Sequence, residues 1–170
     1  ERLDILRVDV LAADNDEIRM TASEAHLANV LLVDDREADA ELTRILLQVR
    51  DKLKFNLIIA RGGQEALDTL RAWAERGETV DLLLLDINMP GMDGFEMLER
   101  LRQDQALRHT AVVMCSGSTY DDDLARAEKL GAAGYMVKPP SLDQLKPMLP
   151  AIPGLHLHQD EAGNRLTRAA

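Results

Sequence analysis

Several reactive side chains in this chain each follow directly after a short apolar run. They are Asp34 and Asp35 after VLLV, Asp86 after four leucines, Ser116 after AVVMC and Lys138 after GYMV. Short apolar runs bounded by turn residues are typical of strands that are buried on both faces, as in a parallel sheet. The carboxyl ends of such strands lie along one edge, where open α/β sheets bind their ligands. We therefore expect three carboxylates, one hydroxyl and one ammonium to share a pocket.

This set of groups favours the chemistry of phosphoryl transfer. Close carboxylates repel one another unless something positive lies between them, and the candidates are Lys138 and a hard divalent cation. Mg²⁺ prefers oxygen ligands and is typically held by one or two carboxylates together with phosphate oxygens. Asp86 alone could be a metal ligand, a nucleophile or a helix cap. With a metal and a lysine to neutralise the moving group, the set indicates phosphoryl transfer onto or near a carboxylate.

Five strand-then-helix units are expected to position these groups. The strands are expected at 30–33, 55–60, 80–85, 111–115 and 134–137, and the helices at 37–52, 64–75, 95–102, 121–130 and 141–145. One face of the first helix carries Leu42, Ile45, Leu46 and Val49, which is typical of an amphipathic helix that packs on a sheet. Alternating units of this kind predict an α/β fold, a parallel sheet with helices on both faces and right-handed crossovers.

Composition narrows the class of partner. The chain has 170 residues and a net charge of −10, and it shows no cluster of Lys and Arg that would suit nucleic acid. No apolar run approaches the roughly 20 residues that span a bilayer, so no membrane contact is expected. The single cysteine excludes an intramolecular disulfide and fits a reducing cytoplasm.

The patterns at the two ends of the chain each fit more than one structure. Residues 1–27 are expected to be an extension or linker, with apolar spacing that fits a helix or a strand equally well. Residues 150–170 are expected to be a tail that forms either a hairpin or an arm packing on a partner subunit. His156 and His158 have strand spacing there, and a solvated tail is favoured over a metal site.

Four motifs, taken together and in order, resemble the receiver domain of bacterial two-component response regulators. They are VDD at 33–35, DINMPGMDG at 86–94, Ser116 followed by a small residue, and GYMVKP at 134–139. The resemblance covers about residues 28–149. It implies a flavodoxin-like, doubly wound sheet of five parallel strands in the order 2-1-3-4-5.

The resemblance also implies roles for the residues around a bound Mg²⁺. Asp86 would be the phosphoacceptor for a sensor histidine kinase or a phosphotransfer protein, and it would also ligate the metal. Asp35 would ligate Mg²⁺ directly, Asn88 would offer its backbone carbonyl, and Asp34 would act through water.

Other residues would bind the phosphoryl group or report its presence. Lys138 and Ser116 would contact the phosphoryl oxygens. Ser116 would move inward, and Tyr135 would change its burial in response. Asn88 and Ser118 flank the site and would tune the lifetime of the phosphorylated form.

The expected function is therefore a signalling switch, not an enzyme, that acts on a downstream protein which the sequence does not name. Two alternatives stay open: a docking module that is not phosphorylated, and a Mg²⁺-dependent phosphatase with an aspartyl nucleophile. Phosphatases of the haloacid dehalogenase group have D-x-D-x-T after their first strand, whereas here Asn88 stands where the second acid would be. The short fifth helix and Pro140 put the usual dimer surface in doubt, so a homodimer would use the C-terminal tail. The chain is either a stand-alone receiver or one cut from a hybrid protein.

Overall fold

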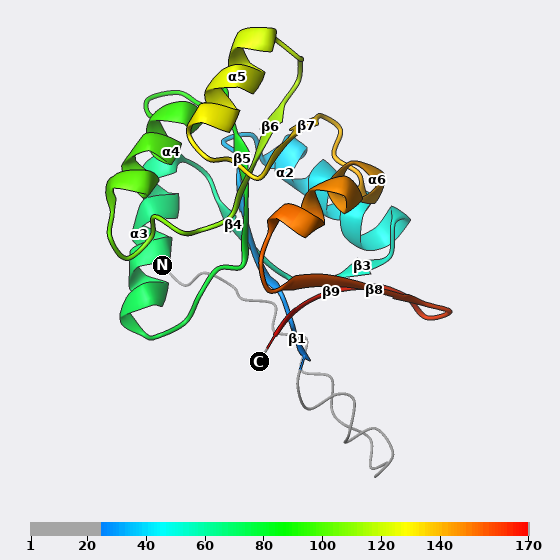
Figure 1. The fold of residues 1–170 in the computed structure, drawn as a ribbon. Helices are drawn as coiled ribbons and strands as arrows, with labels where there is room; N and C mark the ends of the chain where they lie inside the picture. Colours follow the sequence, from blue (N-terminus) through cyan, green and yellow to red (C-terminus); the bar gives the residue numbers. More distant parts are fainter. Residues whose placement is uncertain (1–24, 170) are drawn as a thin grey trace.

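The computed structural model describes residues 25–169, and its centre is a sheet of five parallel strands (Figure 1). The strands are β2 (Asn29–Val33), β4 (Asn56–Ala60), β5 (Leu82–Asp86), β6 (Val112–Ser116) and β7 (Gly134–Val137). Their order across the sheet is β4-β2-β5-β6-β7, and every neighbouring pair is parallel. Counted along the chain within this sheet, the order is 2-1-3-4-5, so the predicted flavodoxin-like fold is confirmed.

Helices cover both faces of this sheet (Figure 1). One face carries α3 (Gly63–Glu75), α4 (Gly94–Gln103) and α5 (Asp121–Lys129), and the other carries α2 (Glu37–Arg44), a π-helical stretch (Ile45–Arg50), α6 (Leu142–Leu145) and a 3₁₀ stretch (Lys146–Ala151). Alternate strand residues serve the two cores, because successive side chains of a strand point to opposite faces. Leu83 and Leu85 pack on the first side, and Leu82 and Leu84 pack on the second. The run of four leucines is thus a strand with two buried faces.

The side of the first helix that packs on the sheet differs from the apolar side predicted from the sequence. Leu42, Ile45 and Val49 are 47%, 40% and 59% exposed. The buried positions of this segment are Ala40, Thr43 and Leu47. The expectation that the apolar stripe would pack on the sheet is therefore wrong. Because one of these inward residues is a small alanine and another is the polar Thr43, hydrophobic periodicity pointed to the solvent side of the helix.

A second, smaller sheet lies at the amino end of the main sheet (Figure 1). It consists of β1 (Ala25–Leu27), β3 (Leu53–Lys54), β8 (Leu155–Asp160) and β9 (Gly163–Ala169). Strands β8 and β9 form an antiparallel hairpin, and the other edge of β9 pairs with β1 and β3. Leu155 and Leu166 are buried in the same core as α2 and α6. The C-terminal residues thus form a hairpin that packs on the chain's own core.

The start of the chain lies mostly beyond the described residues. Of the expected extension at 1–27, the structure describes only residues 25–27, which form β1 and pair with β9. Within residues 25–169 no helix is both long and apolar enough to cross a membrane.

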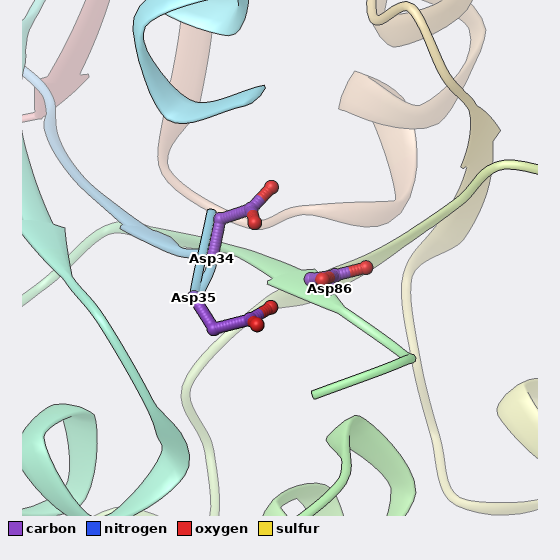
Figure 2. Close-up of side chains that lie close together, drawn as sticks. All are labelled: Asp34, Asp35 and Asp86. Carbon is purple, nitrogen blue, oxygen red and sulfur yellow. The ribbon is translucent and has the colours of Figure 1, made fainter. Parts of the chain in front are cut away.

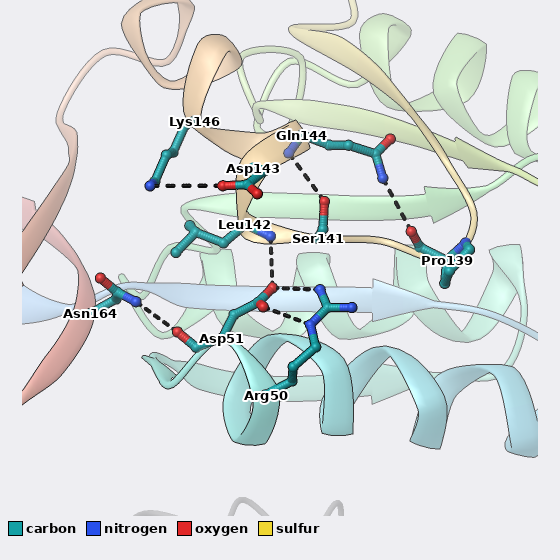
Figure 3. Close-up of polar contacts among 9 residues, drawn as sticks. All are labelled: Arg50, Asp51, Pro139, Ser141, Leu142, Asp143, Gln144, Lys146 and Asn164. Carbon is teal, nitrogen blue, oxygen red and sulfur yellow. Dashed lines mark hydrogen bonds and ion pairs between the residues drawn. The ribbon is translucent and has the colours of Figure 1, made fainter.

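Hydrogen bonds around Asp51 join the hairpin to the last helix (Figure 3). The carboxylate of Asp51 accepts a hydrogen bond from the backbone N–H of Leu142 at 2.9 Å, and it also pairs with Arg50. The side-chain amide of Asn164, on β9, donates to the carbonyl of Asp51 at 2.6 Å. The first turn of α6 and the hairpin are therefore held by the same residue at the end of the π-helical stretch.

Candidate functional site

Three carboxylates meet at the carboxyl edge of the main sheet. Asp34 and Asp35 follow β2, and Asp86 ends the neighbouring strand β5. One oxygen from each lies within 4.8 Å of the others, and Figure 2 shows the three side chains around a common space. The side chains of Asp34 and Asp86 are only 1% and 7% exposed, so two of these carboxylates are held in a poorly solvated place.

Lys138 brings an ammonium group into this cluster from β7. Its Nζ lies 2.9 Å from Asp34 Oδ2 and 3.3 Å from Asp86 Oδ1. A third carboxylate, that of Asp39 on α2, lies 3.6 Å from the same nitrogen. The backbone N–H of Lys138 donates to the carbonyl of Ser116 at 2.7 Å, which joins the loop after β7 to the end of β6.

Burial and charge change the pKa values of both central groups. Burial raises the pKa of Asp86, the negative charge of Asp34 raises it further, and Lys138 opposes both effects. Burial alone would lower the pKa of Lys138, but its hydrogen bond to Asp34 and the charges of Asp86 and Asp34 outweigh this and raise it. The lysine is therefore charged at neutral pH. Since it faces several carboxylates, the pocket still lacks positive charge.

The donor set suits a hard cation such as Mg²⁺. Asp35 Oδ1 is buried and has no hydrogen-bond partner among the described residues. Buried polar atoms are rarely left without a partner, so an unpaired carboxylate oxygen beside two more carboxylates indicates that a ligand belongs there. All the available donors are oxygens, as Mg²⁺ prefers. The residues present therefore fit this metal.

The remaining predicted site residues lie around this pocket at different depths. Ser116 is buried at the end of β6, and its hydroxyl accepts a hydrogen bond from the N–H of Ser118 at 3.3 Å. Tyr135 is half-buried, and its hydroxyl donates to the carbonyl of Ser118 at 2.9 Å. Asn88 is exposed, and its backbone N–H faces Asp86, where it acts to lower the pKa of that carboxyl group. Within residues 25–169, no hydrogen bond joins the Ser116 hydroxyl to Asp86 or Lys138.

Gln144 fixes the backbone on both sides of Lys138, and Figure 3 shows its contact with Pro139 on one of these sides. Its Oε1 accepts from the N–H of Val137 at 2.9 Å, and its Nε2 donates to the carbonyls of Val137 and Pro139 at 3.0 and 3.1 Å. Ser141 caps α6 by accepting from the N–H of Gln144. The Ser-x-x-Gln spacing is that of a capping box, in which the glutamine folds back on the serine. Here the glutamine side chain turns to the lysine loop instead.

Sequence reasoning did not single out Gln144 or Asp39. The capping-box spacing was a signal for Gln144, although it indicates a different contact. For Asp39 the signal was its place in the first turn of the helix that follows Asp34 and Asp35, a turn which lies near the same sheet edge.

Comparisons with known proteins agree with this fold and this pocket. The family model for the response regulator receiver domain matches residues 30–150. Probable methanogenesis regulatory protein FilR2 of Methanothrix harundinacea is 37% identical over 120 residues, which are 69% of this chain and 76% of that protein. Transcriptional regulatory protein CpxR of Escherichia coli is 38% identical over 110 residues, 65% of this chain and 42% of CpxR. The chain therefore spans less than half the length of CpxR.

A solved structure adds a metal-bound example of the same fold. The Mn(2+)-bound form of response regulator Rcp1 superposes with a TM-score of 0.57 at 31% identity, covering 74% of this chain and 91% of that one. The family model matches well over half of the sequence, and the sheet order and acidic edge agree with it. This chain belongs to the family of response regulator receiver domains.

Proposed function

We propose that this receiver domain is a phosphorylation-dependent switch in which Asp86 accepts a phosphoryl group from a sensor histidine kinase or a phosphotransfer protein. The observation that carries the proposal is the Asp86 carboxylate, 3.3 Å from the Lys138 ammonium and grouped with Asp34 and Asp35 at the carboxyl edge of the sheet. The switch then acts through contacts with a downstream protein in the cytoplasm.

In the transfer step an oxygen of Asp86 forms a bond to phosphorus. The bond from phosphorus to the donor breaks, and its electron pair leaves with the donor. Asp35, Asp86 and the backbone carbonyl of Asn88 would hold Mg²⁺ directly, and Asp34 would hold it through water. When bound, Mg²⁺ supplies positive charge that offsets the phosphoryl oxygens. Lys138, which follows β7, offsets the same charge and needs little movement to do so, because its Nζ is already 3.3 Å from Asp86 Oδ1.

The phosphoryl group would then bias the loops after β6 and β7. It adds about −1.5 to −2 charges and three acceptor oxygens. We expect the Ser116 hydroxyl to reach those oxygens through a shift of the loop that begins at Gly117. Because Tyr135 is hydrogen-bonded to Ser118 in that loop, a shift would change the environment of the tyrosine ring. Coupling of this kind is how a local charge selects between two arrangements of a surface.

The lifetime of the phosphorylated form depends on access of water to phosphorus. Asn88 and Ser118 flank the pocket and are the side chains that we expect to tune this access. In hydrolysis the water oxygen bonds to phosphorus and the Asp86 carboxylate leaves, which restores the starting state.

The proposal is tested by phosphoryl uptake from acetyl phosphate in the presence of Mg²⁺. Intact mass should show one added phosphoryl group on the wild type and none on Asp86→Asn, and chelation of Mg²⁺ should abolish the gain. Size-exclusion elution of the same samples tests whether phosphorylation alters the oligomeric state, including a dimer formed through the C-terminal hairpin.

Two other outcomes would replace the proposal. A wild type that neither gains mass nor binds Mg²⁺ in calorimetry would be a docking module without phosphorylation. Steady release of phosphate from small phosphate esters, with Asp86→Asn inactive, would instead identify an aspartyl phosphatase.

A further inference from the structure

Asp39 places an additional carboxylate beside Lys138, at the open side of the pocket. It lies in the first turn of α2, which begins at Glu37. Its Oδ2 is 3.6 Å from Lys138 Nζ. Its side chain is 37% exposed, whereas those of Asp34 and Asp86 are 1% and 7% exposed. The lysine therefore has two buried carboxylates on its inner side and a solvated one at the rim.

Asp34 and Asp39 both contact Lys138, but among the described residues Asp34 has a further hydrogen-bond donor and Asp39 does not. Asp34 is fixed twice, because its two oxygens accept from the N–H of Arg36 at 3.0 Å and from Lys138 at 2.9 Å. Asp39 makes no side-chain hydrogen bond or ion pair within residues 25–169 other than the one with Lys138. Asp34 alone is thus enough to keep the ammonium near the pocket, and the contact with Asp39 is an addition.

We propose that Asp39 is a positioning residue that competes with the phosphoryl group for Lys138. The inference rests on the proposed function of Asp86. A solvated ion pair is weak, so phosphoryl oxygens with their higher charge can displace it. The displacement still has a cost, because Lys138 must exchange the Asp39 carboxylate for those oxygens. Asp39 thereby slows phosphoryl uptake and limits how readily the switch responds.

Glu37 offers a matched control on the same helical turn. It carries the same charge, but its side chain is 78% exposed and pairs with Arg61 at 3.5 Å, away from Lys138. Removing the charge at Glu37 changes the net charge and the first turn of α2 as Asp39→Asn does. It leaves the contacts of the lysine intact.

The test compares the rate of phosphoryl uptake at saturating Mg²⁺ for the wild type, Asp39→Asn, Asp39→Glu and Glu37→Gln. Asp39→Asn should take up phosphoryl groups about two- to fivefold faster, as expected for loss of a solvated ion pair. Glu37→Gln should match the wild type. Asp39→Glu keeps a carboxylate within reach of Lys138 and should restore the slower rate.

A second phosphodonor separates competition for the lysine from simple repulsion of the donor. Acetyl phosphate carries more negative charge near neutral pH than phosphoramidate does. If Asp39 acts through Lys138, Asp39→Asn should be faster by the same factor with both donors. Faster uptake with acetyl phosphate alone, or equal acceleration by Glu37→Gln, would mean that Asp39 merely repels the donor and would overturn the inference.

The remaining outcomes are also distinct. An Asp39→Asn variant that reacts at the wild-type rate, beside a wild type that is phosphorylated normally, would sink the role of Asp39 and leave the switch intact. A wild type that takes up no phosphoryl group would refute the proposed function itself. Thermal unfolding of each variant checks that α2 is still folded.

Discussion

At the level of single residues, the burial of Asp86 costs the folded protein free energy. The residue is 5% exposed, and the neighbouring charge of Asp34 adds to the cost of burial. Lys138 recovers part of this cost but not all of it, since the pKa of Asp86 is still raised in the folded state. A bound cation would offset the negative charge at this position, and it would also offset the charge of an acyl phosphate formed on Asp86. The burial of the negative charge of Asp86 thus underlies both the lower stability of the folded protein and the proposed reactivity of the carboxylate.

This cost predicts that Asp86→Asn stabilises the metal-free protein at neutral pH. A carboxyl group whose folded-state pKa is raised binds its proton more tightly when folded, so its charged form destabilises the fold at every pH above that pKa. The penalty disappears as the pH falls through the raised pKa, and so should the advantage of asparagine. Lys138 keeps its contacts with Asp34 and Asp39 in the variant.

The measurement is thermal unfolding in a chelating buffer at a series of pH values. Addition of Mg²⁺ should then raise the melting temperature of the wild type more than that of Asp86→Asn. A variant that is less stable than the wild type at neutral pH without metal would contradict this account of Asp86.

At the level of elements, one guanidinium joins the ends of two helices to a strand. Arg102, in the last turn of α4, donates to four backbone carbonyls, those of Arg108, Thr110, Leu130 and Gly131, at 2.8 to 3.1 Å. These carbonyls belong to the approach to β6 and to the end of α5. Arg102 has no carboxylate partner within residues 25–169, and burial lowers its pKa. Its function is to donate to carbonyls at the end of α5 and in the turn before β6.

Arg102→Ala should therefore lower the free energy of unfolding by about 2 to 4 kcal/mol, because four carbonyls, two of them in partly buried hydrogen bonds, lose a charged donor at once. Arg102→Lys should recover only part of the loss, since one ammonium cannot match the planar fork of a guanidinium. Arg100→Ala is the control on the same helix, because Arg100 is exposed and, among the described residues, pairs only with Glu96 four residues earlier. Its loss should be within about 0.5 kcal/mol. Urea unfolding measures all three, and equal losses for Arg100→Ala and Arg102→Ala would refute the role of the four carbonyls.

At the level of the whole molecule, the C-terminal hairpin and the receiver fold share one core. Leu166 on β9 is fully buried in the cluster that also contains Val113 of β6 and Met136 of β7. Asn164 on the same strand holds Asp51, which in turn holds α6. The family model ends at residue 150, so the hairpin is an addition to the matched region that is built into its packing.

Leu166→Ala should therefore destabilise the whole domain and not only the hairpin. Truncation of a fully buried leucine costs about 2 to 5 kcal/mol, and we expect one cooperative transition. Arg165→Ala on the same strand removes an exposed side chain whose one ion pair in the described part of the chain is with Asp160, and it should cost little. Unfolding followed by far-UV circular dichroism and by Trp73 fluorescence should give coincident curves. Two separate transitions, with the tryptophan signal unaffected by Leu166→Ala, would show that the hairpin is an independent unit.

The main sheet, and the edge of it where the reactive groups meet, could be predicted from the amino-acid pattern alone. Each strand corresponds to a short apolar run in the sequence. The reactive groups stand directly after such runs, namely Asp34, Asp86, Ser116 and Lys138. Since parallel strands end at one edge, position along the chain is enough to place these groups at that edge. The pattern works because two buried faces require an unbroken run, which is a local signal.

Three features depend on contacts between distant segments: the side of α2 that faces the sheet, the strand pairing of the second sheet, and the position of the Asp39 carboxylate. Periodicity places Leu42, Ile45 and Val49 on one side of a helix, but packing against the leucines of β2 and β5 selected the side with Ala40 and Leu47. Strands β1 and β3 have three and two residues, so their pairing with β9 depends on contacts between distant segments. The reason is the same in each case. A local pattern gives the spacing of side chains, whereas the choice of neighbour is made by the volumes and charges that meet in three dimensions.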